Sequence, residues 1–184
     1  MSYELRLYQS RLGMTPLDVA RADQKAKLIP HAERGAEGAT RRAAERLAET
    51  HPNLKLLRHD WRKLGLWLEE ESRRWVPQHT LQNEAGIEIR LLVDRGFVEI
   101  PYWHQGPKAE AVFADAQQYL QIIQQQTGWF AYDPQLDELL DLAKQLNGSL
   151  ACYQESSRKI PKASPAGKPK AKKPSWIWGH RRKS

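Results

Sequence analysis

The sequence predicts an α+β fold of the ferredoxin-like type, whose elements follow the order strand, helix, strand, strand, helix, strand. Apolar residues alternate with polar ones over residues 3–7 and on both sides of Asp94-Arg95-Gly96, which is typical of strands that bury one face. Over residues 31–50 and 107–127 they recur at three- and four-residue steps instead, which indicates amphipathic helices. At 184 residues, the chain is long enough for one domain with an appendage.

The first half of the chain contains a strand, two helical segments and an insert. Tyr3, Leu5 and Leu7 form the apolar side of the strand, which residues 11–13 end. Residues 15–30 favour a short helix followed by a loop, and residues 31–50 favour a helix that ends at His51-Pro52-Asn53. In the insert, residues 54–86, Asp60 caps a further helix that reaches Trp75. We therefore expect a helical insert before the central hairpin.

The second half contains the hairpin and two helices. Gly96 is expected to supply the positive φ that the hairpin turn requires. Residues 107–127 form a helix that begins at a proline and stops at Gly128. After a short strand at residues 129–132, Asp133 caps another helix that continues to Leu146 and ends at Asn147-Gly148. This last helix is an addition to the ferredoxin-like order.

The predicted topology brings distant segments together. The first and third strands are expected to be antiparallel neighbours at the centre of the sheet, with the fourth strand on the other side of the first. Residues 102–104 and Asp133 then lie at the end of the sheet where Ser2 and Tyr3 begin. Residues 9–12 approach the turn at residues 94–96.

The charge divides the chain into two parts. Residues 1–157, the predicted globular body, contain 19 basic and 22 acidic residues, whereas residues 158–184 contain 10 basic and no acidic residues. The second part, which we call the arm, is rich in Pro, Lys and Ala and has too few large apolar residues to form a core. It ends in Trp176-Ile177-Trp178 followed by basic residues.

Several kinds of chemistry have no support in the sequence. The six histidines include no pair at the spacing of metal ligands, and the chain has neither a glycine-rich phosphate loop nor a Gly-x-Ser-x-Gly motif. Cys152, the one cysteine, lies among apolar residues that do not activate a thiolate. We therefore expect no metal, no cofactor and no catalytic activity. No apolar stretch has the roughly 20 residues of a membrane span, and no signal-peptide pattern begins the chain, so we expect a cytoplasmic protein.

Aromatic residues provide the candidate contact sites of the body. Tyr102, Trp103 and His104 follow the hairpin and form either a rim that contacts a ligand or a packed strand end, which is the commoner arrangement. Trp67 lies off the apolar stripe of the insert helix, and an exposed tryptophan there suits a protein interface.

The arm is the second candidate site. Its lysines neutralise phosphates and its tryptophans stack on bases, although a solubilising tail and a membrane-surface segment are alternatives. The residues proposed to contact a polyanion or partner are Lys168, Lys170, Lys172, Lys173, Trp176, Trp178, Arg181, Arg182 and Lys183.

Two short motifs resemble a set of uncharacterised bacterial proteins. They are Pro101-Tyr102-Trp103-His104 and Tyr132-Asp133-Pro134-Gln135, the second followed by a leucine-rich segment. The resemblance covers residues 87–142 and the first strand, and it implies the fold and a bacterial source but no activity.

The sequence thus favours a non-catalytic binding protein. In the first hypothesis the body recognises a protein partner, most concretely as an immunity or inhibitor protein, or as an adaptor. In the alternative, the basic arm anchors the protein to nucleic acid.

Overall fold

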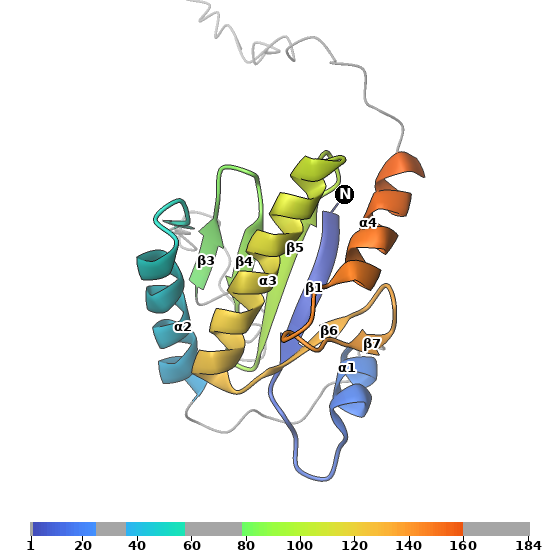
Figure 1. Ribbon diagram of the computed structural model, residues 1–184. Helices are drawn as coiled ribbons and strands as arrows, with labels where there is room; N and C mark the ends of the chain where they lie inside the picture. Colours follow the sequence, from blue (N-terminus) through green and yellow to red (C-terminus); the bar gives the residue numbers. More distant parts are fainter. Residues whose placement is uncertain (1, 25–35, 58–78, 160–184) are drawn as a thin grey trace, which may run out of the picture.

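The computed structural model describes residues 2–24, 36–57 and 79–159, which form a mixed α+β fold (Figure 1). Within these ranges, seven strands form one antiparallel sheet in the order β2-β3-β4-β5-β1-β6-β7. The strands are β1 (Ser2–Tyr8), β2 (Lys55–Leu57), β3 (His79–Gln82), β4 (Glu88–Leu91), β5 (Arg95–Pro101), β6 (Phe130–Asp133) and β7 (Glu138–Leu139). The helices are α1 (Pro16–Gln24), α2 (Ala36–Thr50), α3 (Pro107–Thr127) and α4 (Asn147–Lys159).

Strand β1 lies inside the sheet between β5 and β6, as expected for the first strand. It pairs along its whole length with β5, from Ser2 opposite Pro101 to Tyr8 opposite Arg95, and its second half pairs with β6 on the other side. Because successive side chains of a strand point to opposite faces, β1 divides its residues between two environments. Tyr3, Leu5 and Leu7 are fully buried in the main core.

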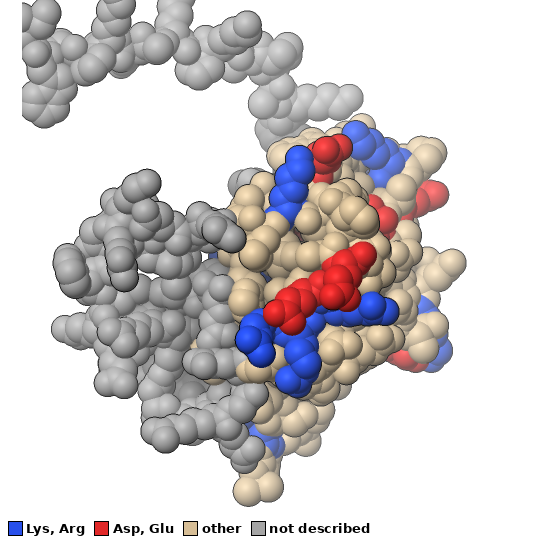
Figure 2. All heavy atoms as spheres, turned by 90° about the vertical axis from the view of Figure 1, so that its left-hand side faces the viewer, with Lys and Arg blue, Asp and Glu red and all other residues tan. Residues whose placement is uncertain are grey.

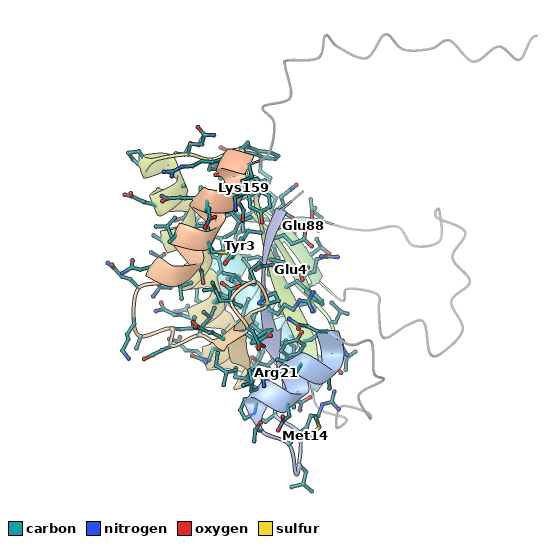
Figure 3. The ribbon with its side chains drawn as sticks, turned by 90° about the vertical axis from the view of Figure 1, so that its right-hand side faces the viewer. Tyr3, Glu4, Met14, Arg21, Glu88 and Lys159 are labelled. Carbon is teal, nitrogen blue, oxygen red and sulfur yellow. The ribbon has the colours of Figure 1, made fainter. Side chains whose placement is uncertain are left out.

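Helices cover the two faces of the sheet unequally. Helices α2, α3 and α4 lie on the face that Tyr3 points to, whereas α1 lies on the opposite face, to which Glu4 and Glu88 point (Figure 3). On that second face Val19 and Ala20 of α1 pack against Tyr8 and Tyr132 in a small separate core. None of the helices in the described ranges has the length and apolar character needed to cross a membrane.

Helix α3 confirms the helix predicted for residues 107–127. Pro107 stands at its start, and Gly128 ends it with a φ of 70° and an N–H that donates to the Gln124 carbonyl at 2.7 Å. The C-terminal glycine is needed because the left-handed conformation is strained for residues with a Cβ. Helices α1 and α2 likewise fall within the two segments predicted to contain helices, residues 15–30 and 31–50.

The helix predicted to begin at Asp133 and reach Leu146 is wrong. The chain instead turns at Asp137, whose φ is 55°, and forms the short strand β7, while α4 begins at Asn147, where the predicted helix was to end. The Gln117 side-chain amide donates to the Leu142 carbonyl at 3.1 Å and to the Lys144 carbonyl at 2.8 Å. The Leu142 carbonyl is one that the predicted helix would have paired with its own N–H at Leu146, whereas the Lys144 carbonyl would lie in the last turn, where a helix leaves carbonyls unpaired.

Two further predictions differ from the structure. The ends of the insert, residues 54–86, form β2 and β3, which extend the sheet beyond β4, while the predicted helix with Trp67 lies outside the described residues. Gly96 lies within β5 and has no positive φ. A Cβ there would lie 3.2 Å from Leu91 Cδ2 and 3.3 Å from Leu7 Cδ1, so close packing, not turn geometry, favours glycine.

Candidate functional site

The candidate site lies where β5 leaves the sheet, at the end where β1 begins. Ser2 is opposite Pro101 in the register, and the Asp133 carboxylate accepts a hydrogen bond from the Tyr3 hydroxyl at 2.6 Å. The opposite end also matches the prediction, because the Gln9 N–H donates to the Asp94 carbonyl at 3.1 Å. The topology therefore places residues 102–104 and Asp133 at the same end of the sheet.

Trp103 is the most exposed aromatic side chain among the described residues, at 70%. Its ring nevertheless lies against the β3–β4 turn, because a Cβ placed on Gly86 would lie only 2.7 Å from Trp103 Cζ2. Gly86 has a φ of 84°, so the turn both requires a glycine and leaves room for the ring. Trp103 is thus presented to solvent from a fixed position.

Tyr102 and helix α4 fix the chain segment that carries Trp103. The Tyr102 ring stacks on Tyr153, with centroids 5.3 Å apart and 15° between the planes. The Tyr153 hydroxyl donates to the Pro101 carbonyl at 2.7 Å and accepts from the His104 N–H at 3.2 Å. Burial raises the pKa of both tyrosines, so both remain neutral hydrogen-bonding groups at physiological pH.

His104 is buried, with 1% of its surface exposed. Its Nε2 donates to the Ala85 carbonyl at 2.7 Å, because a carbonyl can only accept, and Nδ1 has no partner among the described residues. Of the two alternatives for residues 102–104, the structure shows a packed strand end at His104 and an exposed ring at Trp103. Trp67 and the arm residues 160–184 lie outside the described residues.

A buried carboxylate connects the sheet to α4 beside this end. Asp133 Oδ2 accepts hydrogen bonds from Tyr3 and from the Ser149 hydroxyl, at 2.6 and 2.5 Å. Asp133 Oδ1 accepts from the N–H groups of Gln135 and Leu136 at 2.9 and 3.3 Å, so Asp133 caps a turn and not the predicted helix. Because Tyr3, Asp133 and Ser149 are all buried, the three side chains form a structural link and present no reactive group to solvent.

The sheet face that carries α1 holds a continuous network of ion pairs, which sequence reasoning missed. Asp23 of α1 pairs with Arg95, and the Tyr8 hydroxyl donates to Asp23 at 2.8 Å. Burial lowers the pKa of Arg6, but hydrogen bonds with Tyr8 and Glu4 raise it more, so its charge is retained. The other pairs are Arg6–Asp23, Arg95–Asp94, Arg11–Asp94, Arg6–Glu4, Arg90–Glu4, Arg90–Glu88 and Arg90–Glu99. The spacing of Glu4 and Arg6, and of Glu88 and Arg90, at alternate positions of a strand was the one signal in the sequence from which part of this network could have been predicted.

A groove of about 710 Å³ lies between α3 and the start of α4. Helix α3 contributes Gln117, Gln118 and Gln121 to its lining, and Gln145 and Asn147 come from the other wall. The Gln117 and Gln121 amides are already engaged, since both donate to the Leu142 carbonyl. These two residues therefore hold the segment before α4 and are not simply solvated.

The side of the molecule that includes α2 carries both signs of charge. Figure 2 shows acidic and basic side chains next to one another on this side. On α2, Arg41 lies 3.9 Å from Glu45, and Arg46 lies 3.4 Å from Glu49. The part of this surface that the structure describes therefore forms no patch of a single sign.

The described residues include no group of three His, Cys, Asp or Glu side chains placed to hold a metal ion. Cys152 is a free, half-buried thiol. Trp103 is therefore the feature of this end of the sheet that is exposed to solvent. No protein family matches the chain, and no curated protein or solved structure is significantly similar to it.

Proposed function

We propose that the protein is a non-catalytic binding protein whose body recognises a protein partner at the surface around Trp103. The observation that carries the proposal is a tryptophan that is 70% exposed although its ring lies against the backbone of Gly86. Tryptophan is enriched among the residues that dominate binding energy, and a fixed ring loses little conformational freedom on binding. The contacts of Tyr102 and Tyr153 fix the segment that carries the ring.

The charge of the body suggests a more specific form of this proposal. Residues 1–157 have three more acidic than basic residues, which favours association with a basic surface. An immunity or inhibitor protein that covers a basic toxin enzyme has this property, and an adaptor for a basic protein is its more general form. The single cysteine suits a reducing compartment, so we propose the cytoplasm as the location.

A second candidate function belongs to the arm. Its ten basic residues without an acidic one favour binding to a polyanion, and Trp176 and Trp178 add rings that stack on bases. In this alternative the protein is associated with nucleic acid through the arm, and the body serves as an adaptor.

The proposed fold assignment is a ferredoxin-like core with additions. The neighbouring strands β4, β5, β1 and β6 supply the order of that fold, and α3 joins β5 to β6. Strands β2 and β3 extend one edge of these four strands, and β7 extends the other.

Comparative affinity purification tests the proposed function. Tagged full-length protein, Trp103→Ala and Leu56→Ala are expressed in cells of the source organism, and the proteins recovered with each are quantified. Leu56 is a matched control because it is also an exposed apolar residue, at 51%, but lies on edge strand β2. We expect a protein that is recovered with the wild type and Leu56→Ala but lost from Trp103→Ala. Equal recovery with all three would refute the proposal.

A further inference from the structure

The connection between β1 and α1 presents the most exposed large apolar residue of the described chain. We call residues 9–15 the Leu12 loop. Leu12 is fully exposed, at 106%. Met14, which is 36% exposed, lies just before the N-terminal end of α1 (Figure 3). Because seven residues of β1 separate this loop from the end of the sheet at Ser2, it lies about 20 Å from the Trp103 end.

The tip of the loop is a tight turn that holds Leu12 outward. The Met14 N–H donates to the Arg11 carbonyl at 3.2 Å, and Gly13, the third residue of the turn, has a φ of 75°. A positive φ at the third position is the mark of a type II turn, which favours glycine or asparagine there. No atom lies within 4 Å of a Cβ placed on Gly13, so glycine serves the backbone conformation and not packing.

Both ends of the loop are fixed to the body. On the β1 side, Arg11 pairs with Asp94 at 2.6 Å, and the two side chains are only 12% and 14% exposed. On the α1 side, Thr15 caps the helix, because its Oγ1 accepts from the Asp18 N–H at 3.2 Å and donates to the Asp18 carboxylate at 2.6 Å. A segment fixed in this way loses little conformational entropy on binding.

We propose that the Leu12 loop is a docking element that inserts Leu12 into an apolar pocket of a partner protein. A single convex leucine with one flanking methionine fits a pocket of side-chain size. The charges around it oppose a lipid surface, because Arg11 is paired with Asp94, Arg21 is paired with Asp137, and Asp18 adds a negative charge. Membrane-surface segments instead combine larger apolar faces with an excess of basic residues. The proposal does not depend on Trp103, which lies at the other end of the sheet.

Photo-crosslinking followed by affinity measurement tests the proposal. Full-length protein carrying p-benzoylphenylalanine at position 12, or at position 139 as a control, is irradiated in cells of the source organism. We expect a product specific to position 12. Leu139 is a matched control because it is also exposed and apolar but lies on edge strand β7.

The cross-linked protein is then purified, and its Kd for four variants is measured by calorimetry. Leu12→Ala should weaken binding by about tenfold to 100-fold, as expected for losing a buried leucine side chain. Gly13→Ala should weaken it several-fold by straining the turn, whereas Gly13→Asn and Leu139→Ala should remain within about twofold of the wild type. Circular dichroism checks that every variant is folded.

Several results would overturn the proposal. These are the absence of a product specific to position 12, or a Kd for Leu12→Ala within about twofold of the wild type. A dimer that Leu12→Ala dissociates would identify a second copy of the chain as the occupant. Binding to phosphatidylserine vesicles that is lost in Leu12→Ala would identify a membrane. Trp103→Ala is measured in parallel: a loss confined to that variant refutes the Leu12 loop and retains the proposed function.

Discussion

The buried Asp133 carboxylate should be one of the main stabilising links between the sheet and α4. Asp133→Asn keeps the size of the side chain but replaces one carboxylate oxygen with an NH₂ donor. In the folded protein two hydroxyls, from Tyr3 and Ser149, point at one oxygen and two backbone N–H groups point at the other. With its NH₂ group toward the backbone, the amide would face two donors. With its NH₂ group toward the hydroxyls, it would donate to their oxygens, and both buried hydroxyl protons would lose their acceptor.

The expected cost follows from these contacts. Hydrogen bonds to a charged group contribute roughly 1.5–3 kcal/mol each and neutral ones about 0.5–1.5 kcal/mol, and here two charged bonds are replaced by neutral ones. The difference is about 1–1.5 kcal/mol for each bond, and a neutral amide costs less to bury than a carboxylate, so we expect a loss of about 2 kcal/mol of unfolding free energy. For a body of this size that corresponds to a decrease in Tm of roughly 4–8 °C.

Urea and thermal denaturation followed by circular dichroism measure this effect. Asp141→Asn is the control, because Asp141 is an exposed carboxylate that also caps a turn, through the Ala143 N–H. The double variant of Asp133→Asn with Tyr3→Phe should lose less stability than the sum of the single variants, because both remove the same hydrogen bond. An Asp133→Asn protein as stable as Asp141→Asn, or strictly additive effects, would contradict the reasoning.

Three further predictions concern other parts of the chain. Asp23→Ala should destabilise the fold by about 3 kcal/mol. This is the lower end of the range for breaking a buried ion pair, because Arg95 keeps its second ion pair, with Asp94. Urea denaturation measures the effect, and an unchanged midpoint would contradict the prediction. Burial lowers the pKa of His79 in the folded protein, so the protein should lose stability as the pH falls below 6.5, the ordinary pKa of histidine. Denaturation at pH 7.5 and 5.5 should therefore show a smaller loss of stability for His79→Gln than for the wild type. Equal losses would count against this prediction. Deleting residues 160–184 should leave Tm unchanged but abolish any binding to labelled DNA or RNA. For the full-length protein, the logarithm of the affinity should fall with the logarithm of the salt concentration by roughly 0.7–0.9 per phosphate contact. Salt-insensitive binding that survives the deletion would assign recognition to the body.

Local signals explain what could be predicted from the sequence. Helix α3 has a proline at its start, a glycine after its end and an apolar arc between them, and all three act within a few residues. The alternation in β1 and the two strands of the hairpin likewise depend on neighbours in the sequence. Because these strands were identified correctly, the end of the sheet that holds Trp103 and Asp133 was also predicted.

Contacts between distant residues explain what could not be predicted. Residues 136–146 have a helical apolar period, but Asp133 starts a turn, and Gln117 satisfies the carbonyls of Leu142 and Lys144 from another helix. The ion pairs of Asp23 and Arg95 join residues 72 positions apart. The support of Trp103 by Gly86 depends on a turn within the insert, which was expected to be helical. No local pattern in the sequence encodes these contacts.

The dissociation constant for the partner recovered with the wild type tests the central claim most directly. Isothermal titration calorimetry would compare the full-length protein with Trp103→Ala and Leu56→Ala, after circular dichroism has shown that each is folded. If Trp103 is the anchor of the interface, Trp103→Ala should weaken binding by about 30-fold or more, and Leu56→Ala should remain within about twofold of the wild type. A Trp103→Ala protein that binds within about twofold of the wild type would contradict the account.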